Sequence, residues 1–150
     1  MAQPELEHWS TSADDPSYAD SVQPIIDREL HDLVEVDHRI CNEVSLVSTP
    51  GHTPGHVSVL IESAGDRALI TGDCFHHPVQ LSRPDWCSSA DSDQVQGEVT
   101  RRSLLQGLSG DDADILVIGT HFPTPTAGRV RMPRAAVAGS TSTLERATPT

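Results

Sequence analysis

The stretch TPGHTPGH, residues 49–56, repeats the four-residue phrase Thr-Pro-Gly-His without a gap. Two histidines four residues apart would share one face of a helix, as they do in helical zinc motifs. The prolines and glycines of this stretch make a helix very unfavourable. Apolar runs typical of short strands flank it, at residues 44–48 and 57–61. The sequence therefore predicts a rigid loop between strands, a setting that holds a side chain in a fixed direction.

More strands are expected beyond this loop. Residues 68–71 and 115–118 are short apolar runs bounded by turn-forming residues. The segment 63–66, Ser-Ala-Gly-Asp, is typical of a hairpin turn and would join the strand at 57–61 to the strand at 68–71. We therefore expect a hairpin directly after the histidine loop.

Helices are indicated where apolar residues recur at intervals of three or four. Residues 21–36 and 93–108 fit this spacing, which predicts two amphipathic helices. The chain ends in a Ser-, Thr-, Pro- and Ala-rich stretch without a sustained period. We accordingly expect one structured domain over residues 21–130, with a loose lead-in before it and a flexible tail after it, at residues 1–20 and 131–150.

Composition restricts the classes of function. The chain has 150 residues, of which 36% are hydrophobic and only 3% aromatic, so we expect a single aliphatic core. A net charge of −12 argues against nucleic acid or an anionic membrane as partner and suits a site that gathers cations. The partner that we expect is a small-molecule substrate. No apolar window reaches the length of a membrane span, and the start MAQPELEHW does not resemble a signal peptide. The three cysteines show no CxxC spacing, which favours a reduced, cytoplasmic setting.

Three polar residues stand next to the expected strands. His56 precedes the strand at 57–61, Asp73 ends the run ALITGD, and His121 ends the run ILVIGTH. Strand ends that deliver imidazole or carboxylate groups form the sites of many α/β folds, and zinc accepts both kinds of ligand. We expect these side chains to converge at one edge of a sheet. Spacing alone leaves open whether they bind metal or fill ordinary loop and turn positions.

Several stretches resemble the later motifs of the metallo-β-lactamase-fold hydrolases, namely TPGHTPGHVSVLIE, ALITGD and IGTHFPTPTAGRV. The resemblance covers residues 9–130. The stretch FHHPVQLSRPDW, followed by a helix that carries TRRSLL, is similar to the branch with lactone and organophosphate hydrolases. The resemblance implies an α/β (α+β) fold, the C-terminal half of a four-layer αββα sandwich.

The resemblance also implies roles for single residues. His56 would be the third ligand of a first metal ion, and His121 the last ligand of a second. Asp73 would bridge both ions and is therefore the expected catalytic residue. His52 would shape the loop outside the metal site. The implied cofactor is one or two zinc ions, with manganese, iron or cobalt as alternatives.

The family's upstream signature His-x-His-x-Asp-His is not found in the 150 residues. Its closest counterpart is the pair Asp37-His38, which has no histidines at the positions needed before it. Each ion would then keep two protein ligands, whereas a stable zinc site takes about four. The interpretation is a truncated or split enzyme with an exposed apolar sheet face. Its partner would be a chain that supplies the missing half or a second copy of the same chain.

Residues near the expected site have two possible roles. His76 and His77 either contact the substrate or form an exposed loop pair. Trp86 either lines the substrate pocket or anchors a loop by packing. Cys74 follows a proposed ligand, and core packing is the favoured role for its thiol.

Three functions remain after this reasoning. The first is a metal-dependent hydrolase in which a metal-activated water attacks an ester, lactone, thioester or phosphotriester. The second is a non-catalytic half-domain or interaction module that folds against another chain. The third is a glyoxalase-type thioesterase with the same ligand set.

Overall fold

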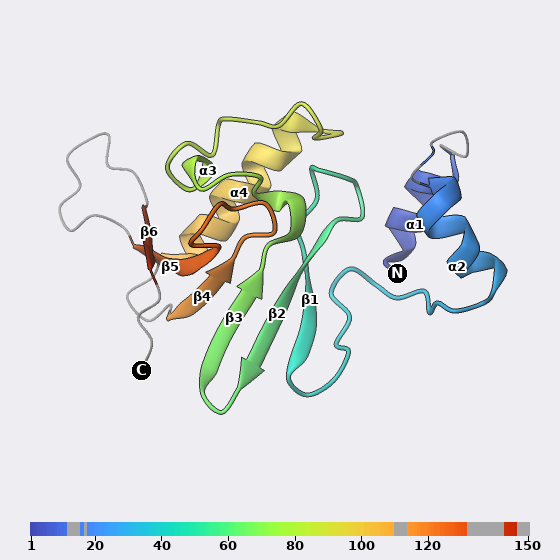
Figure 1. The fold of residues 1–150 in the computed structure, drawn as a ribbon, viewed down its shortest axis with the longest axis horizontal. Coiled ribbons are helices and arrows are strands. Elements are labelled where there is room, and N and C mark those ends of the chain that lie inside the picture. Colours follow the sequence, from blue (N-terminus) through green and yellow to red (C-terminus); the bar gives the residue numbers. More distant parts are fainter. Residues whose placement is uncertain (12–15, 17, 110–113, 132–142, 147–150) are drawn as a thin grey trace.

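A six-stranded sheet with the strand order β1-β2-β3-β4-β5-β6 forms the centre of the fold (Figure 1). The computed structural model describes residues 1–11, 16, 18–109, 114–131 and 143–146. Neighbouring strands are antiparallel except β3 and β4, which are parallel. The strands are β1 Val44–Ser48, β2 Val57–Ser63, β3 Asp66–Ile70, β4 Ile115–Ile118, β5 Ala127–Arg131 and β6 Thr143–Arg146.

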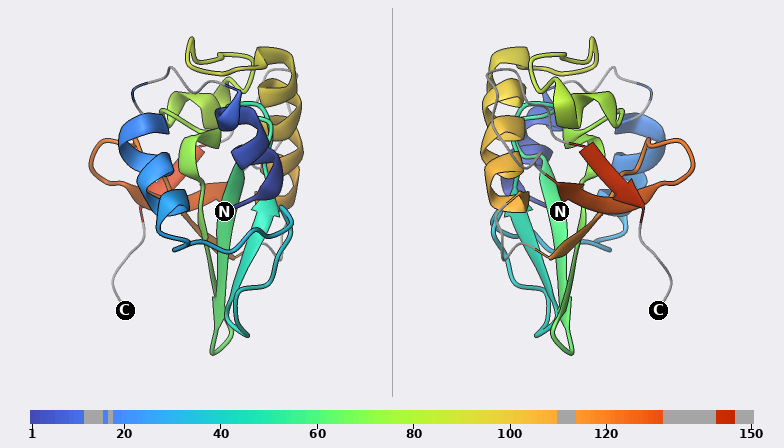
Figure 2. Two further views of the ribbon diagram at one scale, coloured as in Figure 1. Left: turned by 90° about the vertical axis from the view of Figure 1, so that its right-hand side faces the viewer. Right: turned by 90° about the vertical axis from the view of Figure 1, so that its left-hand side faces the viewer.

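The helices are short except for one. They are α1 Gln3–Ser10, the π-helix η1 Tyr18–Val22, α2 Gln23–Asp27, the 3₁₀ turn η2 Gly72–Cys74, α3 Val79–Ser82 and α4 Gln94–Leu108. Helix α4 runs along one face of the sheet, whereas α1 and α2 lie beyond the β1 edge (Figures 1 and 2). None of the described helices is both long and apolar enough to cross a membrane.

The local predictions around the hairpin and α4 are confirmed. The strands expected at 57–61 and 68–71 are found as β2 and β3, shifted by one or two residues at their ends. Ala64 and Gly65 join them with φ angles of 53° and 93°, the left-handed conformation of a tight hairpin turn. Asp93 caps α4 by accepting a hydrogen bond from the amide of Gln96 at 2.9 Å.

The helix predicted over residues 21–36 is wrong beyond Asp27. Helix α2 ends there, and Glu29 takes a φ of 54°, which breaks the helical path. Leu30 and Leu33, two of the apolar residues within the range predicted as helical, are 67% and 50% exposed. Helical periodicity without a surface to pack against does not sustain a helix.

Both ends of the chain contain regular elements in segments that were expected to be loose. Within the lead-in, Gln3–Ser10 form α1. Within the expected tail, Thr143–Arg146 form β6, which pairs antiparallel with β5. Residues 132–142 and 147–150 of that tail lie outside the described residues. These elements depend on long-range contacts, which local periodicity does not reveal.

The hydrophobic core lies on the α4 side of the sheet. Leu69 of β3 and Val117 of β4 are 3% and 0% exposed there, and they belong to one cluster with Leu105 and Leu108 of α4. Burial of these aliphatic side chains provides the main stabilisation of the fold.

The opposite face of the sheet carries a second set of aliphatic side chains, which we call the open sheet face. The strand registers place the following on it: Val44, Leu46, Val59, Ile61, Ala68, Ile70, Leu116 and Ile118. All of them are only partly buried, and the core cluster contains none of them. Among the described residues, the apolar face expected from the sequence is therefore partly, not fully, exposed.

Candidate metal centre

The loop at residues 49–56 is clamped from two sides, as predicted for a rigid loop. Gly51 has a φ of 136° and lies so close to α4 that a Cβ at this position would be 2.3 Å from the Cα of Gly97. The hydroxyl of Thr100 on α4 donates to the carbonyl of Pro50 at 2.6 Å. On the other side, Thr53 donates to the Glu5 carboxylate of α1 at 2.7 Å. These contacts fix the directions in which both loop histidines point.

The predicted convergence of three polar residues is confirmed. Strands β3 and β4 are parallel, so their carboxyl ends lie at the same edge of the sheet and bring Asp73 and His121 together. Nε2 of His121 lies 3.1 Å from Oδ1 of Asp73. The third residue, His56, reaches the same place, because its Nε2 lies 3.0 Å from the backbone nitrogen of Asp73.

His56 supports the site through hydrogen bonds to the backbone. The amide of Asp73 donates to its Nε2, so the proton of the neutral ring is on Nδ1, which faces the carbonyl of Thr49 at 3.0 Å. Both nitrogens are thus engaged by the protein. Within the described part of the chain, His56 belongs to neither group of side chains that is arranged to hold a metal ion. This geometry opposes the predicted role of His56 as a metal ligand.

His52 lies inside the cluster, so the prediction that it lies outside was wrong. Its Nε2 is 3.3 Å from Oδ2 of Asp73, and its Nδ1 is 3.6 Å from Oδ1 of Asp91. The two histidines of the loop thus occupy positions opposite to those expected for them. The reason is that His56, beside strand β2, contacts Thr49 and the backbone of Asp73, whereas Nε2 of His52, at the bend of the loop, faces the Asp73 carboxylate.

His76 lies between the other imidazoles. Its ring is stacked on that of His121, with centroids 5.4 Å apart and planes at 7°, and its centroid lies 5.1 Å from that of His52. Burial, and then the charge of His52, lower the pKa of His76 below its ordinary value. The neutral form is therefore favoured, and it offers a lone pair. Nδ1 of His76 has no hydrogen-bond partner although it is buried.

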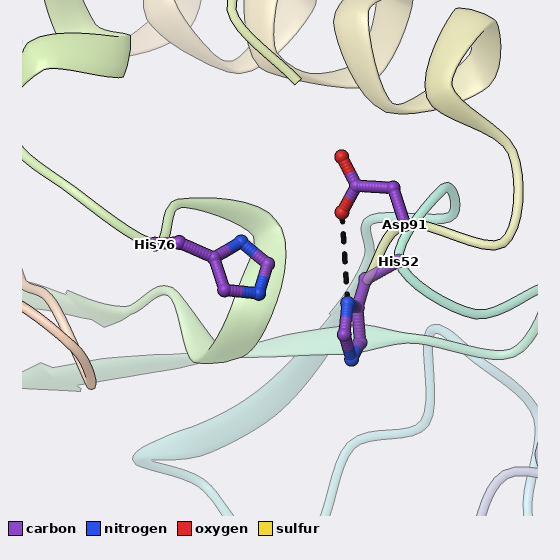
Figure 3. Close-up of side chains that lie close together, drawn as sticks. All are labelled: His52, His76 and Asp91. Atoms are coloured by element: carbon purple, nitrogen blue, oxygen red, sulfur yellow. Dashed lines mark ion pairs between the residues drawn. The ribbon is translucent and has the colours of Figure 1, made fainter. Parts of the chain in front are cut away.

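Two overlapping groups of side chains are arranged so that they could hold a cation. One contains Asp73, His76 and His121, and the other contains His52, His76 and Asp91 (Figure 3). Within each group the potential ligand atoms lie within 4.8 Å of one another. Sequence reasoning missed Asp91, which stands in a polar loop run and is indistinguishable there from a surface residue.

The remaining candidate residues lie outside these groups. His77 is exposed, and its Nδ1 accepts a hydrogen bond from the amide of Val79 at the start of α3. Trp86 is 52% exposed, with the guanidinium of Arg83 5.2 Å from its ring centroid. The proposed contacts of His77 and Trp86 with substrate stay predictions. Cys74 packs in the core as expected, and its burial raises the pKa of the thiol to about 12.

Acidification is expected to destabilise the fold through His56. Burial, the largest cause, lowers its pKa below the ordinary 6.5, so the unfolded chain takes up the proton first. The stabilisation is complete above about pH 6.5 and is lost as the pH falls through the folded-state pKa. Urea unfolding between pH 7.5 and pH 5 measures this loss. The variant His56→Gln keeps an acceptor for the Asp73 amide without titrating, and equal pH dependence in both proteins would contradict the prediction.

Comparison with known proteins adds a family and a fold. The model of the metallo-beta-lactamase superfamily matches residues 1–119. A search of the curated proteins gives no match. Among solved structures, a hydrolase named AbOPH of the beta lactamase superfamily matches with a TM-score of 0.77 and 19% identity, covering 99% of this chain and 55% of that one.

Two other solved structures support the same fold. AidC, a dizinc quorum-quenching lactonase in complex with a product, matches with a TM-score of 0.72 and 17% identity, over 99% of this chain and 55% of that one. A probable metal-dependent hydrolase from Staphylococcus aureus matches with a TM-score of 0.60 and 20% identity, over 79% and 41% of the two chains. This chain thus spans about half the length of these solved proteins.

Proposed function

Because the chain belongs to the metallo-beta-lactamase superfamily, we propose that it is a metal-dependent hydrolase that acts on an ester, lactone or related bond. One observation carries this proposal. The two oxygens of the Asp73 carboxylate face different imidazoles, Oδ1 toward His121 and Oδ2 toward His52. A carboxylate placed in this way is suited to bridge two cations.

The residues present fit a divalent cation. Imidazole nitrogens and a carboxylate are the ligands that zinc accepts, and manganese, iron or cobalt bind similar sets. We propose His52, Asp73 and His121 as ligands. His76 offers a further ligand atom, because its buried Nδ1 has no protein partner. His56 holds the Asp73 backbone in place.

A cation bound by these residues supplies Lewis acidity, which activates water and polarises a carbonyl or phosphoryl group. The chain's own residues set the conditions for that chemistry. His56 orients Asp73, and the contact of the loop with α4 orients His52. The structural similarity to AidC and to other lactonases supports testing lactones first.

A partner is part of this proposal. A closed zinc site takes about four protein ligands, and the histidines around a shared Asp73 do not complete two such sites. We propose that a chain carrying further ligands, or a second copy of this chain, covers the open sheet face and completes the centre. The partly exposed aliphatic side chains of that face support an apolar contact there.

A metal titration joined to an activity screen tests the proposal. The purified chain is titrated with Zn²⁺, Co²⁺ and Mn²⁺, and hydrolysis of homoserine lactones and aryl esters is followed with and without a polypeptide that carries His-x-His-x-Asp-His. Weak metal uptake and slow turnover by the chain alone, both increased by the added polypeptide, are expected. Absence of metal uptake in both samples would overturn the proposal.

The second candidate is a non-catalytic half-domain that only binds another chain. The open sheet face favours it, because this face requires a cover whether or not the site is active. A complex that forms on the open sheet face, yet neither takes up metal nor hydrolyses any substrate, would support this candidate over the enzyme.

A further inference from the structure

Asp91 is a buried carboxylate that is held from behind by Arg101 of α4. Its side chain is 0% exposed and that of Arg101 is 1% exposed. Oδ2 of Asp91 accepts hydrogen bonds from Nη1 of Arg101 at 3.2 Å and from the amide of Ser88 at 3.1 Å. Arg101 is itself fixed, because its Nε donates to the carbonyl of Pro84 at 3.0 Å. One carboxylate oxygen is thus fully engaged, and the orientation of the carboxylate is set.

The other oxygen of Asp91 faces His52 across a short gap (Figure 3). Oδ1 of Asp91 and Nδ1 of His52 lie 3.6 Å apart, and both are buried atoms without another hydrogen-bond partner. An unsatisfied buried polar atom is destabilising, so two such atoms that face each other are best satisfied together. A proton on Nδ1 of His52 does this once the two atoms approach to an ordinary hydrogen-bond distance.

We propose that Asp91, aligned by Arg101, is the positioning residue that keeps His52 in its Nδ1–H form. This inference rests on the proposed function, in which His52 is a metal ligand through Nε2. With the proton on Nδ1, the lone pair of His52 is on Nε2, which lies 3.3 Å from Oδ2 of Asp73. Metal-binding histidines generally donate their second N–H to a carboxylate in this way.

A different reading of the same cluster is a cation bound directly by His52, His76 and Asp91. The charges oppose it. The guanidinium of Arg101 lies 3.2 Å from Asp91 and already balances its carboxylate in a buried environment. A cation bound to Asp91 would face that fixed positive charge at close range, with little water to screen it. A proton on the neutral His52 ring adds no charge, and the geometry therefore favours positioning.

An arginine at position 101 is suited to hold the Asp91 carboxylate in one orientation. Its planar fork offers several donors at fixed angles, which allows Arg101 to contact Asp91, Pro84 and the thiol of Cys87 at once. A lysine has a single rotatable ammonium group and would not hold the carboxylate in one orientation. Arg101 therefore acts on His52 only through Asp91.

Nitrogen NMR of ¹⁵N-histidine-labelled protein tests the inference without metal and without activity. In the metal-free chain, the His52 ring is expected to be in the Nδ1–H form, and in Asp91→Asn it is expected to shift toward a mixture. The spectrum of the unchanged chain decides the inference by itself, even if the Asp91→Asn variant fails to fold. An Nε2–H form or an even mixture in the unchanged chain would overturn the inference.

Metal titrations complete the test. Asp91→Asn is expected to weaken Zn²⁺ binding by about 10- to 100-fold, as is typical of outer partners of metal-bound histidines. Asp93→Asn, two residues away, keeps the helix cap and is the matched control with unchanged affinity. Zn²⁺ that shifts Nδ1 of His52 rather than Nε2 would assign the cation to Asp91 and overturn the positioning role. If Zn²⁺ does not bind at all, the proposed function fails, whereas the metal-free spectrum still decides the inference.

Discussion

Replacement of Asp73 by Ala is expected to abolish metal binding by the chain together with any hydrolysis. The Asp73 carboxylate lies close to both His52 and His121, at distances of 3.3 and 3.1 Å. Its removal leaves imidazoles on two sides of an empty position. We expect a loss of Zn²⁺ affinity larger than the roughly 10- to 100-fold loss that is typical when a residue hydrogen-bonded to a metal ligand is replaced. Competition with a chromophoric zinc chelator measures it.

The control for this variant is another aspartate. Asp85 pairs with Arg83 at the surface, at 3.0 Å, and lies outside the cluster, so Asp85→Ala removes the same charge without touching the site. The fold of Asp73→Ala should persist, because His56 contacts the backbone of residue 73 rather than its side chain. Equal Zn²⁺ affinity of the two variants would show that the metal, if bound, is held elsewhere.

The sheet edge that carries the site was predictable because local patterns determine it. Strand ends at Asp73 and His121 follow from apolar runs that stop at a polar residue, and a helix between the two strands makes their parallel pairing the natural connection. The α/β class and the hairpin follow from the same local signals. None of these features requires knowledge of side-chain contacts between residues that are distant in the sequence.

The assignment of the two loop histidines was not predictable in this way. His52 and His56 have identical neighbours in the repeated phrase, so spacing treats them alike. Two contacts distinguish them: the amide of Asp73 donates a hydrogen bond to Nε2 of His56, and the Asp91 carboxylate faces His52. Both contacts join residues that are distant in sequence. A repeated motif therefore locates the loop but does not indicate which histidine faces the Asp73 carboxylate.

The N-terminal helix shows the same limit. Glu5 accepts hydrogen bonds from Trp9 within α1 and from Thr53 in the histidine loop, at 2.8 and 2.7 Å. A Cβ on Gly55 would lie 2.3 Å from the amide nitrogen of Glu5, so the helix and the loop are in close contact. The polar composition of the first residues predicts looseness, whereas this contact orders them.

The second large expected effect is a difference in stability between lysine substitutions on the two faces of the sheet. Leu69→Lys places an ammonium group in the core, where Leu69 is 3% exposed, and should cost on the order of 3–5 kcal/mol or prevent folding. Val59→Lys, at the centre of the open sheet face, should cost only about 1 kcal/mol, mainly from the lower strand propensity of lysine. Urea unfolding monitored by circular dichroism measures both.

The same pair of variants decides whether the open sheet face needs a partner. If another chain or a second copy covers Val59, an ammonium group at its centre weakens that association, while the chain by itself keeps its fold. Sedimentation velocity is expected to show self-association of the unchanged chain and a monomer for Val59→Lys. Destabilisation of a demonstrated monomer by Val59→Lys as severe as that by Leu69→Lys would mean that the face is covered within the chain itself. The partner proposed to complete the metal centre would then lose its docking surface.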